Sequence, residues 1–368
     1  MRILVTGANG FVGKNLCVRL GEQTGFEVFS ITRESTAADL AAAASQADFV
    51  FHLAGVNRPQ NVEEFHTGNA LFTQSLCDAL AATQRQIPLV YTSSTHAEID
   101  NPYGQSKLAA ENLIFDYAKN SGSSIFIYRL PNIFGKWCMP NYNSGVATFC
   151  HNIARGLPIS INDPSAPLRL VYIDDVVNSF LNLLEHPTAA SGFQKIDPVY
   201  ATTVGAVAES IESFKHSRDT LLTERVGTGF MRALYSTYVS YLPTDSFSYK
   251  VVKHGDPRGV FVEMLKTPDA GQFSFFTAHP GITRGDHYHH TKTEKFLVIK
   301  GKAHFGFRNI ASNETFELVT DGDDPEIVET VPGWTHNITN IGDQEMIVML
   351  WANEIFDRAK PDTIAQKV

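Results

Sequence analysis

The chain begins Met1-Arg-Ile-Leu-Val-Thr-Gly-Ala-Asn-Gly-Phe-Val-Gly-Lys-Asn-Leu16, and this stretch decides the fold of its first half. Residues 3–5 form a short apolar run that is typical of a buried parallel strand. Gly7, Gly10 and Gly13 follow at once, and then an amphipathic helix pattern begins. A strand, a glycine turn and a helix N-terminus together predict a pyrophosphate site, because glycine lets the backbone approach the ligand and the helix dipole favours negative charge. The spacing is G-x-x-G-x-x-G rather than G-x-G-x-x-G, so a glycine turn without a ligand is the alternative.

The composition is that of a globular protein with room for two domains. The chain has 368 residues, of which 43% are hydrophobic and 19% charged, both ordinary values. Its net charge of −9 argues against a nucleic-acid or anionic-membrane partner, and no apolar run reaches the roughly 20 residues that span a bilayer. From Arg2 onward the residues have the pattern of a strand and not that of a signal peptide. The cysteines are not spaced as metal ligands or as a redox pair. We therefore expect a cytoplasmic protein with reduced thiols.

Further apolar runs predict the other strands of the first domain. Residues 26–31, 48–53 and 89–94 each form such a run, and the alanine-rich residues 37–47 predict a helix. This pattern indicates an open α/β sheet, which binds its ligands beyond the carboxyl ends of its strands. His52 lies within one of these strands, where we interpret it as a core residue with its hydrogen bonds satisfied.

The end of the second strand predicts which nicotinamide cofactor binds. An acidic residue at this place binds the free 2′-hydroxyl of NAD. The chain instead has Thr32 and Arg33, a small hydroxyl and a cation that suit a 2′-phosphate. We therefore expect NADPH, with a solvated arginine as the alternative.

Hydroxyl groups close the fourth strand, which ends at Ser94, and Asn101-Pro-Tyr-Gly-Gln-Ser-Lys107 follows. Tyr103 and Lys107 are four residues apart, which places both side chains on one face of a helix. A phenol beside an ammonium group loses its proton more readily, which suits a general acid near neutral pH. Such pairs also occur by chance on exposed helices. The pair indicates a catalytic site only because Ser94 ends the preceding strand and the glycine turn opens the domain.

Together these motifs resemble the extended short-chain dehydrogenase/reductase family, which acts on nucleotide-activated sugars. The resemblance is carried by Gly7/Gly10/Gly13, His52-Leu-Ala-Gly55, Thr92-Ser-Ser94 and Tyr103-x-x-x-Lys107. It implies an α/β Rossmann domain in which Ser94 polarises the substrate, Tyr103 transfers the proton and Lys107 holds the nicotinamide ribose. It also implies a cofactor site made of Gly7, Gly10, Phe11, Val12, Gly13, Thr32, Arg33, Leu53, Ala54, Gly55, Tyr103 and Lys107.

Two later segments resemble the substrate-binding part of the same family. In Arg129-Leu-Pro-Asn-Ile-Phe-Gly135 the resemblance implies that Asn132 contacts the substrate diphosphate. In Leu168-Arg-Leu-Val-Tyr-Ile-Asp-Asp-Val176 it implies the same for Arg169, and a guanidinium group suits that task.

Two features beside these segments are interpreted from the residues alone. Residues 136–146 are aromatic and polar without clear periodicity, and we expect a substrate loop there. Asp174 and Asp175 precede a helical pattern and are interpreted as helix caps, with catalytic carboxylates as the alternative.

The character of the chain changes at a polar break near residues 243–250. Helical patterns at residues 204–215 and 232–240 come before the break. After it, short β-type runs separated by glycine and proline predict a sandwich or small barrel. These runs are residues 259–265, 273–277, 295–299, 303–307, 314–319 and 346–351. We therefore divide the chain into a reductase domain at residues 1–245 and a second domain at residues 246–368.

The chemistry of the second domain lies in Gly281-Ile-Thr-Arg-Gly-Asp-His-Tyr-His-His-Thr-Lys-Thr-Glu294. His287 and His289 share one face of a strand, and with Glu294 and a distant His336 they form an N/O set that suits Zn, Mn, Fe, Co or Ni. Metal-free structural histidines are the alternative. His290 should point away from the lumen, and His304 is left over. Asp286, Tyr288 and Lys295 are polar neighbours that could act as acid or base, and the sequence does not choose among them.

This stretch resembles the first motif of the cupin family at every fixed position, which are Gly281, His287, His289, Glu294 and Gly301. Residues 332–340 match the second motif, except that Pro332 is one residue too close to His336. The resemblance implies an all-β jelly-roll domain. It also implies zinc, or another divalent transition metal, held by His287, His289, Glu294 and His336.

The fusion of the two domains resembles the bifunctional enzymes of capsule and O-antigen synthesis. This likeness spans nearly the whole chain, including residues 137–144 and 233–243. It implies a UDP-4-ketosugar substrate, UDP-2-acetamido-2,6-dideoxy-4-hexulose, and two steps on it. The cupin domain inverts C3, and the Rossmann domain then reduces the C4 ketone with NADPH to UDP-2-acetamido-2,6-dideoxy-L-talose, a precursor of N-acetyl-L-fucosamine. A homodimer is expected on the same resemblance.

Two other classes of function stay open. The cupin could be a dimerising or sugar-binding module beside a plain reductase, or its metal could only brace the barrel. The whole chain could also be a non-catalytic NADPH-binding regulator. The intact set of Ser94, Tyr103 and Lys107 argues against a regulator.

Overall fold

The structure is a computed structural model that describes residues 1–185, 190–252, 254–256, 259–261, 264–265, 267, 271–354 and 359–368. The chain forms two compact units. The first unit comprises Met1–Ser144 and Leu168–Ala201, and the second comprises Gly145–Pro167 and Thr202–Val368. The predicted division between residues 245 and 246 therefore falls inside the second unit, because three helices that precede it belong with the C-terminal β-sheets. No helix in the described ranges is both long and apolar enough to cross a membrane.

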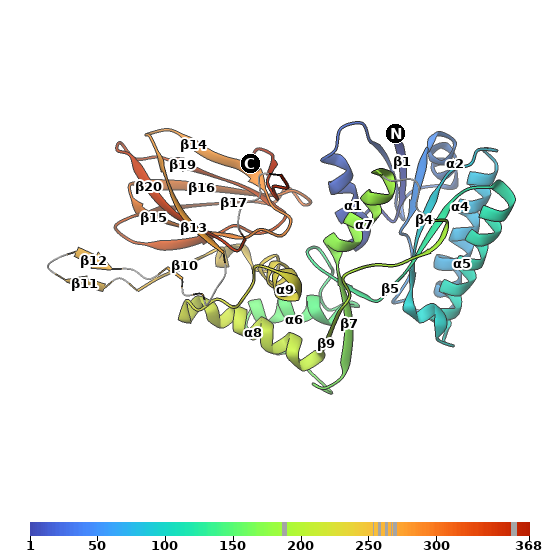
Figure 1. Cartoon of the computed structure of the whole chain (residues 1–368), viewed down its shortest axis with the longest axis horizontal. Coiled ribbons are helices and arrows are strands. Elements are labelled where there is room, and N and C mark those ends of the chain that lie inside the picture. Colours follow the sequence, from blue (N-terminus) through green and yellow to red (C-terminus); the bar gives the residue numbers. More distant parts are fainter. Residues whose placement is uncertain are drawn as a thin grey trace. The chain divides into compact units, whose positions relative to one another are not determined.

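The first unit is built on a six-stranded sheet whose neighbouring strands are all parallel (Figure 1). In spatial order these are β2 (Glu27–Ile31), β1 (Arg2–Thr6), β3 (Phe49–His52), β4 (Leu89–Ser94), β5 (Ile125–Leu130) and β8 (Gly192–Gln194). The chain runs from β1 to β2 on one side and then crosses to β3 on the other. This reversal makes the carboxyl ends of β1 and β3 the place where an open α/β sheet binds its ligand.

Helices cover both faces of this sheet (Figure 1). On one face lie α2 (Ala37–Gln46), α4 (Phe72–Ala81) and α5 (Pro102–Ser121), and on the other lie α1 (Phe11–Gly21) and α7 (Ile173–Glu185). A short helix α3 (Glu63–Phe65) and a π-turn η1 (His66–Leu71) lead into α4, and a 3₁₀ turn η2 (Thr95–Glu98) follows β4. A small sheet comprises β6 (Asn132–Phe134), β7 (Pro167–Tyr172) and β9 (Tyr200–Thr203).

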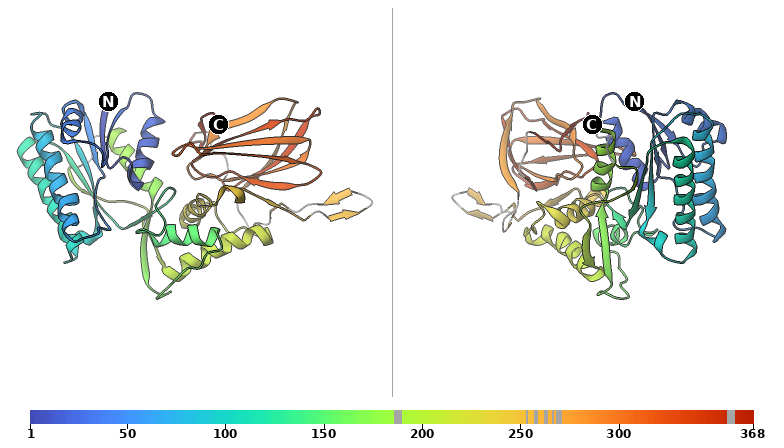
Figure 2. Two further views of the ribbon diagram at one scale, coloured as in Figure 1. Left: turned by 180° about the vertical axis from the view of Figure 1, so that it is seen from behind. Right: turned by 45° about the vertical axis from the view of Figure 1, so that its right-hand side comes forward.

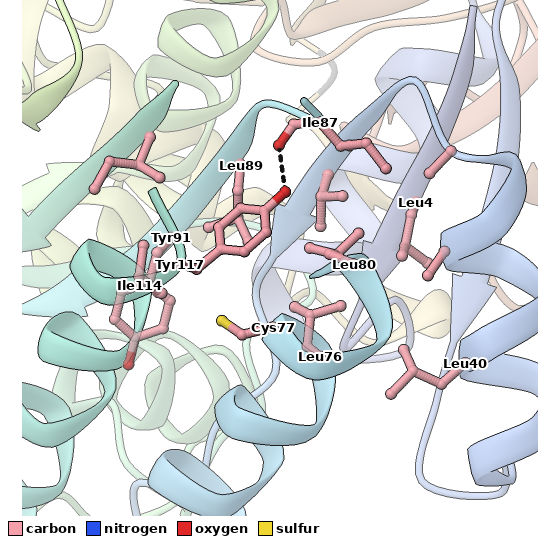
Figure 3. Close-up of a cluster of buried hydrophobic side chains, with 14 of the residues drawn as sticks. Leu4, Leu40, Leu76, Cys77, Leu80, Ile87, Leu89, Tyr91, Ile114 and Tyr117 are labelled. Atoms are coloured by element: carbon pink, nitrogen blue, oxygen red, sulfur yellow. Dashed lines mark hydrogen bonds between the residues drawn. The ribbon is translucent and has the colours of Figure 1, made fainter. Parts of the chain in front are cut away.

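The apolar core of the first unit lies between the sheet and the helices α2, α4 and α5 (Figure 3). Leu4, Leu76 and Ile114 come from a strand and two helices and are fully buried. Tyr117 enters the same cluster, and its hydroxyl donates to the Ile87 carbonyl at 3.0 Å. The ring thus gains apolar contact without leaving its hydroxyl unsatisfied.

The glycine turn is packed too tightly for side chains at two positions. Gly7 has φ +69°, and a Cβ there would lie 2.7 Å from the Ala54 nitrogen. A Cβ on Gly13 would lie 2.2 Å from the Gly7 carbonyl oxygen. These approaches bring the turn, the start of α1 and the segment after β3 together, so glycine is required there for packing.

We expect Gly13→Ala to destabilise the protein by about 1–3 kcal/mol, because the new methyl group must push backbone aside. The variant should also lose NADPH affinity, since the same backbone forms the predicted pyrophosphate site. Denaturant unfolding and NADPH titration would measure the two effects. Gly21→Ala is the matched control, because a Cβ there meets nothing within 4 Å and alanine favours a helix. Equal stability of the two variants would contradict this account.

The second unit contains a two-sheet β-sandwich of cupin-like form (Figure 1, Figure 2). One sheet has the order β10 (Ser248–Lys250), β18 (Glu326–Glu329), β15 (Glu294–Lys300), β20 (Met346–Ala352) and β13 (Gln272–Ala278). The other has the order β17 (Thr315–Asp321), β16 (Lys302–Asn309), β19 (Trp334–Asn340), β14 (Thr283–Tyr288) and β21 (Ile364–Ala365). Phe296 and Phe305 meet between the sheets with ring centroids 5.9 Å apart. A short ribbon pairs β11 (His254–Asp256) with β12 (Gly259–Phe261).

Three helices belong to the second unit, namely α6 (Gly145–Ala154), α8 (Val204–Thr220) and α9 (Gly229–Val239), and the 3₁₀ turn η3 (Thr244–Ser246) leads from them into β10. Buried charges tie α8 to the sandwich. Arg218 donates to Glu329 at 2.8 Å, and Lys295 contacts the same carboxylate. The Lys295 ammonium also donates to the Tyr249 hydroxyl at 3.0 Å, so the helices and the strands share one buried polar network.

Most predicted elements are present with shifted ends. The predicted strand at residues 89–94 coincides with β4, and the helix expected at residues 204–215 extends to Thr220 in α8. The strand expected at residues 259–265 is described only as β12, since part of that range lies outside the described residues. Strands β18, β19 and β21 were not predicted, because their residues are polar or very short runs. A strand was expected to carry both His287 and His289, but β14 ends at Tyr288, so His289 lies just beyond it.

Candidate functional site

The glycine turn lies at the reversal point of the sheet, between β1 and β3. The Gly7 nitrogen donates to the Ile31 carbonyl at 2.8 Å, and the Gly10 nitrogen donates to the Gly7 carbonyl at 2.9 Å. Gly10 is the N-cap of α1 and supplies no side-chain cap. The first amide groups of α1 are therefore not capped by Gly10 and suit an anionic ligand. The predicted residues Phe11 and Val12 form the first turn of this helix, and Leu53, Ala54 and Gly55 follow β3 opposite it.

The residues after β2 are exposed, as a cofactor-binding segment requires. Arg33 is exposed and follows Thr32 at the end of the strand. The Thr32 hydroxyl donates to Glu34 at 3.2 Å, so an acidic side chain that the sequence analysis did not weigh also lies here. The structure thus supplies both a cation and a carboxylate at the place of the adenosine ribose.

His52 is a core residue, as interpreted from the sequence. Its two ring nitrogens contact the hydroxyls of Thr6 at 2.7 Å and Thr73 at 2.8 Å. Burial, together with the charge of Lys107, lowers the pKa of His52 to about 3. A neutral, fully engaged imidazole is not available as an acid or base.

Ser94, Tyr103 and Lys107 gather at the carboxyl end of β4. Ser94 is the last residue of β4, and its hydroxyl accepts from the His96 nitrogen at 3.1 Å and opposes the rise that burial causes in the pKa of the nearby Tyr103. Tyr103 and Lys107 lie one turn apart in the first part of α5, whose N-cap Asn101 accepts from the Gly104 nitrogen at 2.8 Å. The three residues thus lie on neighbouring elements at one end of the sheet, and their role in proton transfer stays a prediction.

The Lys107 ammonium group does not contact Tyr103 in this structure. It donates to the Thr92 carbonyl at 2.9 Å and to the Tyr91 hydroxyl at 3.3 Å. Burial raises the pKa of Tyr103 above its ordinary value, and the Ser94 hydroxyl only partly offsets this. The expected lowering of that pKa by Lys107 is therefore absent here, and Tyr103 is protonated at neutral pH, as a general acid must be.

The structure predicts how reduction at this site depends on pH. Burial lowers the pKa of Lys107 to about 8, against an opposing effect of Glu111. The positive charge beside the site is therefore present at neutral pH and is lost as the pH rises through about 8. We expect ketosugar-dependent NADPH oxidation to be level near neutral pH and to decrease above that value, as measured in a pH–rate profile. A rate that increases through this range would contradict the assignment.

The two predicted substrate residues lie on adjacent strands of the small sheet. Asn132 begins β6 and pairs in register with Leu170 of β7. Arg169 precedes Leu170, and successive residues of a strand face opposite sides. Both predicted side chains are exposed, but the register does not bring them to one face. Their contact with substrate stays a prediction.

Residues 136–144 form a loop whose first residue is anchored. The loop expected at residues 136–146 ends earlier because α6 begins at Gly145, and its contact with substrate stays a prediction. The Lys136 ammonium lies 2.7 Å and 2.9 Å from the two Asp174 carboxylate oxygens, and both side chains are buried. Asp174 and Asp175 lie within the first turn of α7, which already begins at Ile173, so the two residues do not precede the helix as the cap interpretation expected. The ion pair gives Asp174 a structural role that the sequence did not reveal.

The four predicted metal ligands converge in the β-sandwich. The ligand atoms of His287, His289, Glu294 and His336 all lie within 4.8 Å of one another. His287 on β14 pairs in register with His336 on β19, and Glu294 begins β15 on the other sheet. The structure therefore brings the four predicted residues together although they come from two sheets, and their binding of a metal stays a prediction.

The donor set fits a divalent transition metal. Burial, reinforced by the charges of His336 and His289, lowers the pKa of His287 to about 4. Burial would raise the pKa of Glu294, but the histidines and Lys292 hold it well below its ordinary value. Imidazole nitrogens around an ionised carboxylate are the donor set that Zn²⁺ and similar ions bind. Among the described residues, neither His336 ring nitrogen has a hydrogen-bond partner, and a metal in the cluster would engage the one that faces Glu294, Nε2.

The three polar residues that were considered as acid or base for the cluster have different surroundings in the structure. Lys295 follows Glu294 on β15, faces the other side and is engaged by Glu329, so it is not an acid or base for this site. Asp286 accepts from Asn337 at 2.9 Å, and Tyr288 is buried against the His290 ring. Lys292, which sequence reasoning missed, has its ammonium 2.9 Å from Glu294 Oε1. It lies in the variable part of the motif, where no spacing rule marks it.

The two remaining histidines lie outside the four-residue cluster. His290 is buried, and its backbone nitrogen donates to Asp362 at 2.9 Å. His304 lies on β16, with its Nε2 atom 3.3 Å from Glu317 Oε2. The placement of both residues outside the cluster is consistent with their omission from the predicted ligand set.

Comparisons with known proteins agree with both halves of the chain. The profile of the polysaccharide biosynthesis C-terminal domain matches residues 254–364, and that of the NAD dependent epimerase/dehydratase family matches residues 3–196. The chain is 58% identical to a UDP-2-acetamido-2,6-beta-L-arabino-hexul-4-ose reductase from Pseudomonas aeruginosa, over 100% of this chain and 99% of the relative.

Solved structures give the same result. The capsular polysaccharide assembling protein CapF from Staphylococcus aureus is similar over the full length of both chains, with 44% identity and a TM-score of 0.70. UDP-glucuronic acid 4-epimerase from Bacillus cereus, solved with NAD, shares the fold over 58% of this chain and 84% of its own, with 22% identity and a TM-score of 0.53. The chain therefore belongs to the NAD dependent epimerase/dehydratase family and carries a polysaccharide biosynthesis C-terminal domain after it.

Proposed function

We propose that the first unit reduces the 4-keto group of a UDP-ketosugar with NADPH. The observation that carries this proposal is the set of Ser94, Tyr103 and Lys107 beside the glycine turn, in a chain 58% identical to a relative named as a UDP-hexul-4-ose reductase. NADPH, when bound, supplies the hydride. Ser94 binds the ketone oxygen, Tyr103 donates a proton to it, and Lys107 binds the nicotinamide ribose.

The choice of NADPH over NADH depends on one cation. Arg33 is exposed at the end of β2 and suits a 2′-phosphate, whereas Glu34 beside Thr32 would repel it. We propose that the attraction of Arg33 for the 2′-phosphate exceeds the repulsion by Glu34, so that the protein binds NADPH more tightly than NADH. Comparison of the two cofactors at equal concentration would test this point, and a preference for NADH would contradict it.

We propose that the β-sandwich inverts C3 of the same sugar before reduction. The 4-keto group makes the C3 proton acidic, since the resulting carbanion delocalises onto oxygen. A divalent metal such as Zn²⁺ held by His287, His289, Glu294 and His336 would stabilise negative charge on that oxygen. Lys292, whose ammonium lies beside Glu294, is a nearby group able to exchange protons. Reduction must come second, because it removes the ketone on which C3 acidity depends.

Identification of the product tests the two steps together. Purified protein incubated with UDP-2-acetamido-2,6-dideoxy-4-hexulose and NADPH should yield the C4-reduced sugar with C3 inverted, UDP-2-acetamido-2,6-dideoxy-L-talose, as determined by NMR. A reduced product with C3 unchanged would favour the second candidate, a reductase whose cupin only dimerises or binds sugar. The name of the 58% identical relative mentions reduction alone, which is the observation in favour of that candidate.

The remaining proposals concern the substrate contacts, the oligomeric state and the cellular location of the protein. Asn132 and Arg169 are proposed to contact the substrate diphosphate, and their exposure permits it. A homodimer in the cytoplasm, supplying a sugar nucleotide for capsule or O-antigen, is proposed by analogy with the relatives. Sedimentation of the purified protein would test the dimer directly.

A further inference from the structure

The C-terminal segment of the chain is built into the wall of the four-residue cluster. Strand β21 pairs with β14, with Ala365 opposite His287 and Ile364 opposite Tyr288. The Gln366 nitrogen donates to the Asp286 carbonyl at 2.8 Å. A ligand-bearing strand thus has the C-terminal segment as its edge partner.

Asp362, just before β21, binds the loop that joins two of the ligands. Its carboxylate accepts from the backbone nitrogens of His290 at 2.9 Å, Thr291 at 2.7 Å and Lys292 at 2.8 Å. The Thr291 hydroxyl adds a fourth bond at 3.1 Å. This loop begins at His289 and ends at Glu294, so one buried carboxylate fixes the segment that sets the distance between those two ligands.

The backbone of Asp362 acts on a ligand directly. Its carbonyl oxygen contacts Nδ1 of His289. A carbonyl can only accept, so Nδ1 of His289 is the donor of this contact and the ring is held by that atom. Its other nitrogen, Nε2, lies 3.2 Å from Glu294 Oε2. The contact with Asp362 therefore orients His289 so that Nε2 is the atom turned toward the other three residues of the cluster, as an outer partner of a metal ligand does.

We propose that Asp362 is a positioning residue of the metal centre, whose carboxylate holds the 290–292 backbone and whose carbonyl orients the His289 ring. This inference rests on the proposed metal site but not on the epimerase reaction. Outer partners of this kind typically change metal affinity by about 10–100-fold when removed. The cluster would keep its four ligands without Asp362, but their spacing would no longer be set in advance.

The test uses the full-length protein, stripped of metal and titrated with Zn²⁺ against a chromophoric chelator. Asp362→Asn preserves shape but turns one acceptor oxygen into a donor that faces backbone N–H groups. We expect it to weaken Zn²⁺ binding by about 10–100-fold and to reduce the rise in Tm that Zn²⁺ produces. A merely structural role would lower the Tm of metal-free and loaded protein equally and leave the Zn²⁺ affinity unchanged.

Two further variants make the result decisive. Asp321→Asn is the matched control, because Asp321 likewise accepts from two backbone nitrogens, of Asp323 and Asp324, in a turn outside the cluster. It should leave the Zn²⁺ affinity unchanged. Thr291→Val removes only the hydroxyl that donates to Asp362 and should weaken binding by about fivefold, the effect of one hydrogen bond. If Asp362→Asn does not fold, Thr291→Val decides the question.

The outcomes separate the inference from the function it rests on. Wild-type affinity for Zn²⁺ in both Asp362→Asn and Thr291→Val would overturn the inference and leave the metal centre standing. Failure of the wild-type protein to bind Zn²⁺ would overturn the metal centre and the inference with it. Zn²⁺ binding without any exchange at C3 would overturn only the epimerase proposal.

Discussion

Tyr103→Phe should decrease ketosugar-dependent NADPH oxidation by roughly 10²–10⁴-fold, the usual contribution of a positioned general acid. The variant loses only the hydroxyl that lies near Ser94, so NADPH affinity should be unchanged. Exchange of the C3 hydrogen should also continue, because it occurs at a site that does not contain Tyr103. Stopped-flow absorbance of NADPH and a separate binding titration would measure both quantities.

Tyr117→Phe is the matched control for that experiment. Tyr117 is a buried tyrosine of the same helix α5, and its hydroxyl donates to the carbonyl of Ile87 (Figure 3), which precedes β4 while Ser94 ends that strand. Its loss should cost about 1 kcal/mol of stability and leave turnover intact. If Tyr103→Phe reduced the ketosugar as fast as Tyr117→Phe, the proton-transfer role assigned to Tyr103 would be wrong.

Glu294→Gln should remove bound metal and stop exchange at C3. The carboxylate oxygens of Glu294 lie 3.2 Å from His289, 3.6 Å from His336 and 2.9 Å from Lys292, so loss of its charge affects every neighbour. We expect metal content well below one ion per chain and a decrease in C3 exchange of roughly 10²–10³-fold, as for loss of a group that stabilises an oxyanion. Elemental analysis and mass spectrometry of the sugar would measure these.

Glu317→Gln provides the comparison for that loss. Glu317 also lies beside a histidine, His304, at 3.3 Å, but on the exposed side of β17. This substitution should leave metal content and exchange unchanged. Exchange that persists in metal-free Glu294→Gln would favour a cupin that only braces the fold or binds sugar.

The sequence was sufficient to predict those parts of the fold and the candidate sites whose residues lie close together along the chain. The strand and glycine turn at residues 3–13 predicted β1, α1 and their ligand-binding end, because glycine is needed where backbones approach closely. The His-x-His and Glu spacing led to three of the four clustered residues, because the sequence motif that carries them is short and local. His336 was found only through a second motif, and the structure brings it opposite His287 by the register of β14 and β19.

The sequence was insufficient where charges meet across long separations. Nothing in the local pattern marks Lys295 as a partner of Glu329, and its position after Glu294 suggested a residue near the cluster instead. The alternation of a strand turns it away. Asp362 is likewise invisible without the fold, since its partners lie about 70 residues earlier in the chain. The domain boundary predicted at residue 245 has the same weakness. Helices α6, α8 and α9 come before that residue in the sequence but pack with the strands that follow it.

The most direct test is to incubate the enzyme with UDP-2-acetamido-2,6-dideoxy-4-hexulose in D₂O without NADPH, and then to add NADPH. Before NADPH is added, deuterium should enter the sugar at C3 while the ketone persists, and afterwards the C4-reduced product should carry that deuterium with C3 inverted. A sugar that gains no deuterium, or a product that keeps its original configuration at C3, would contradict the use of one ketone for two successive reactions.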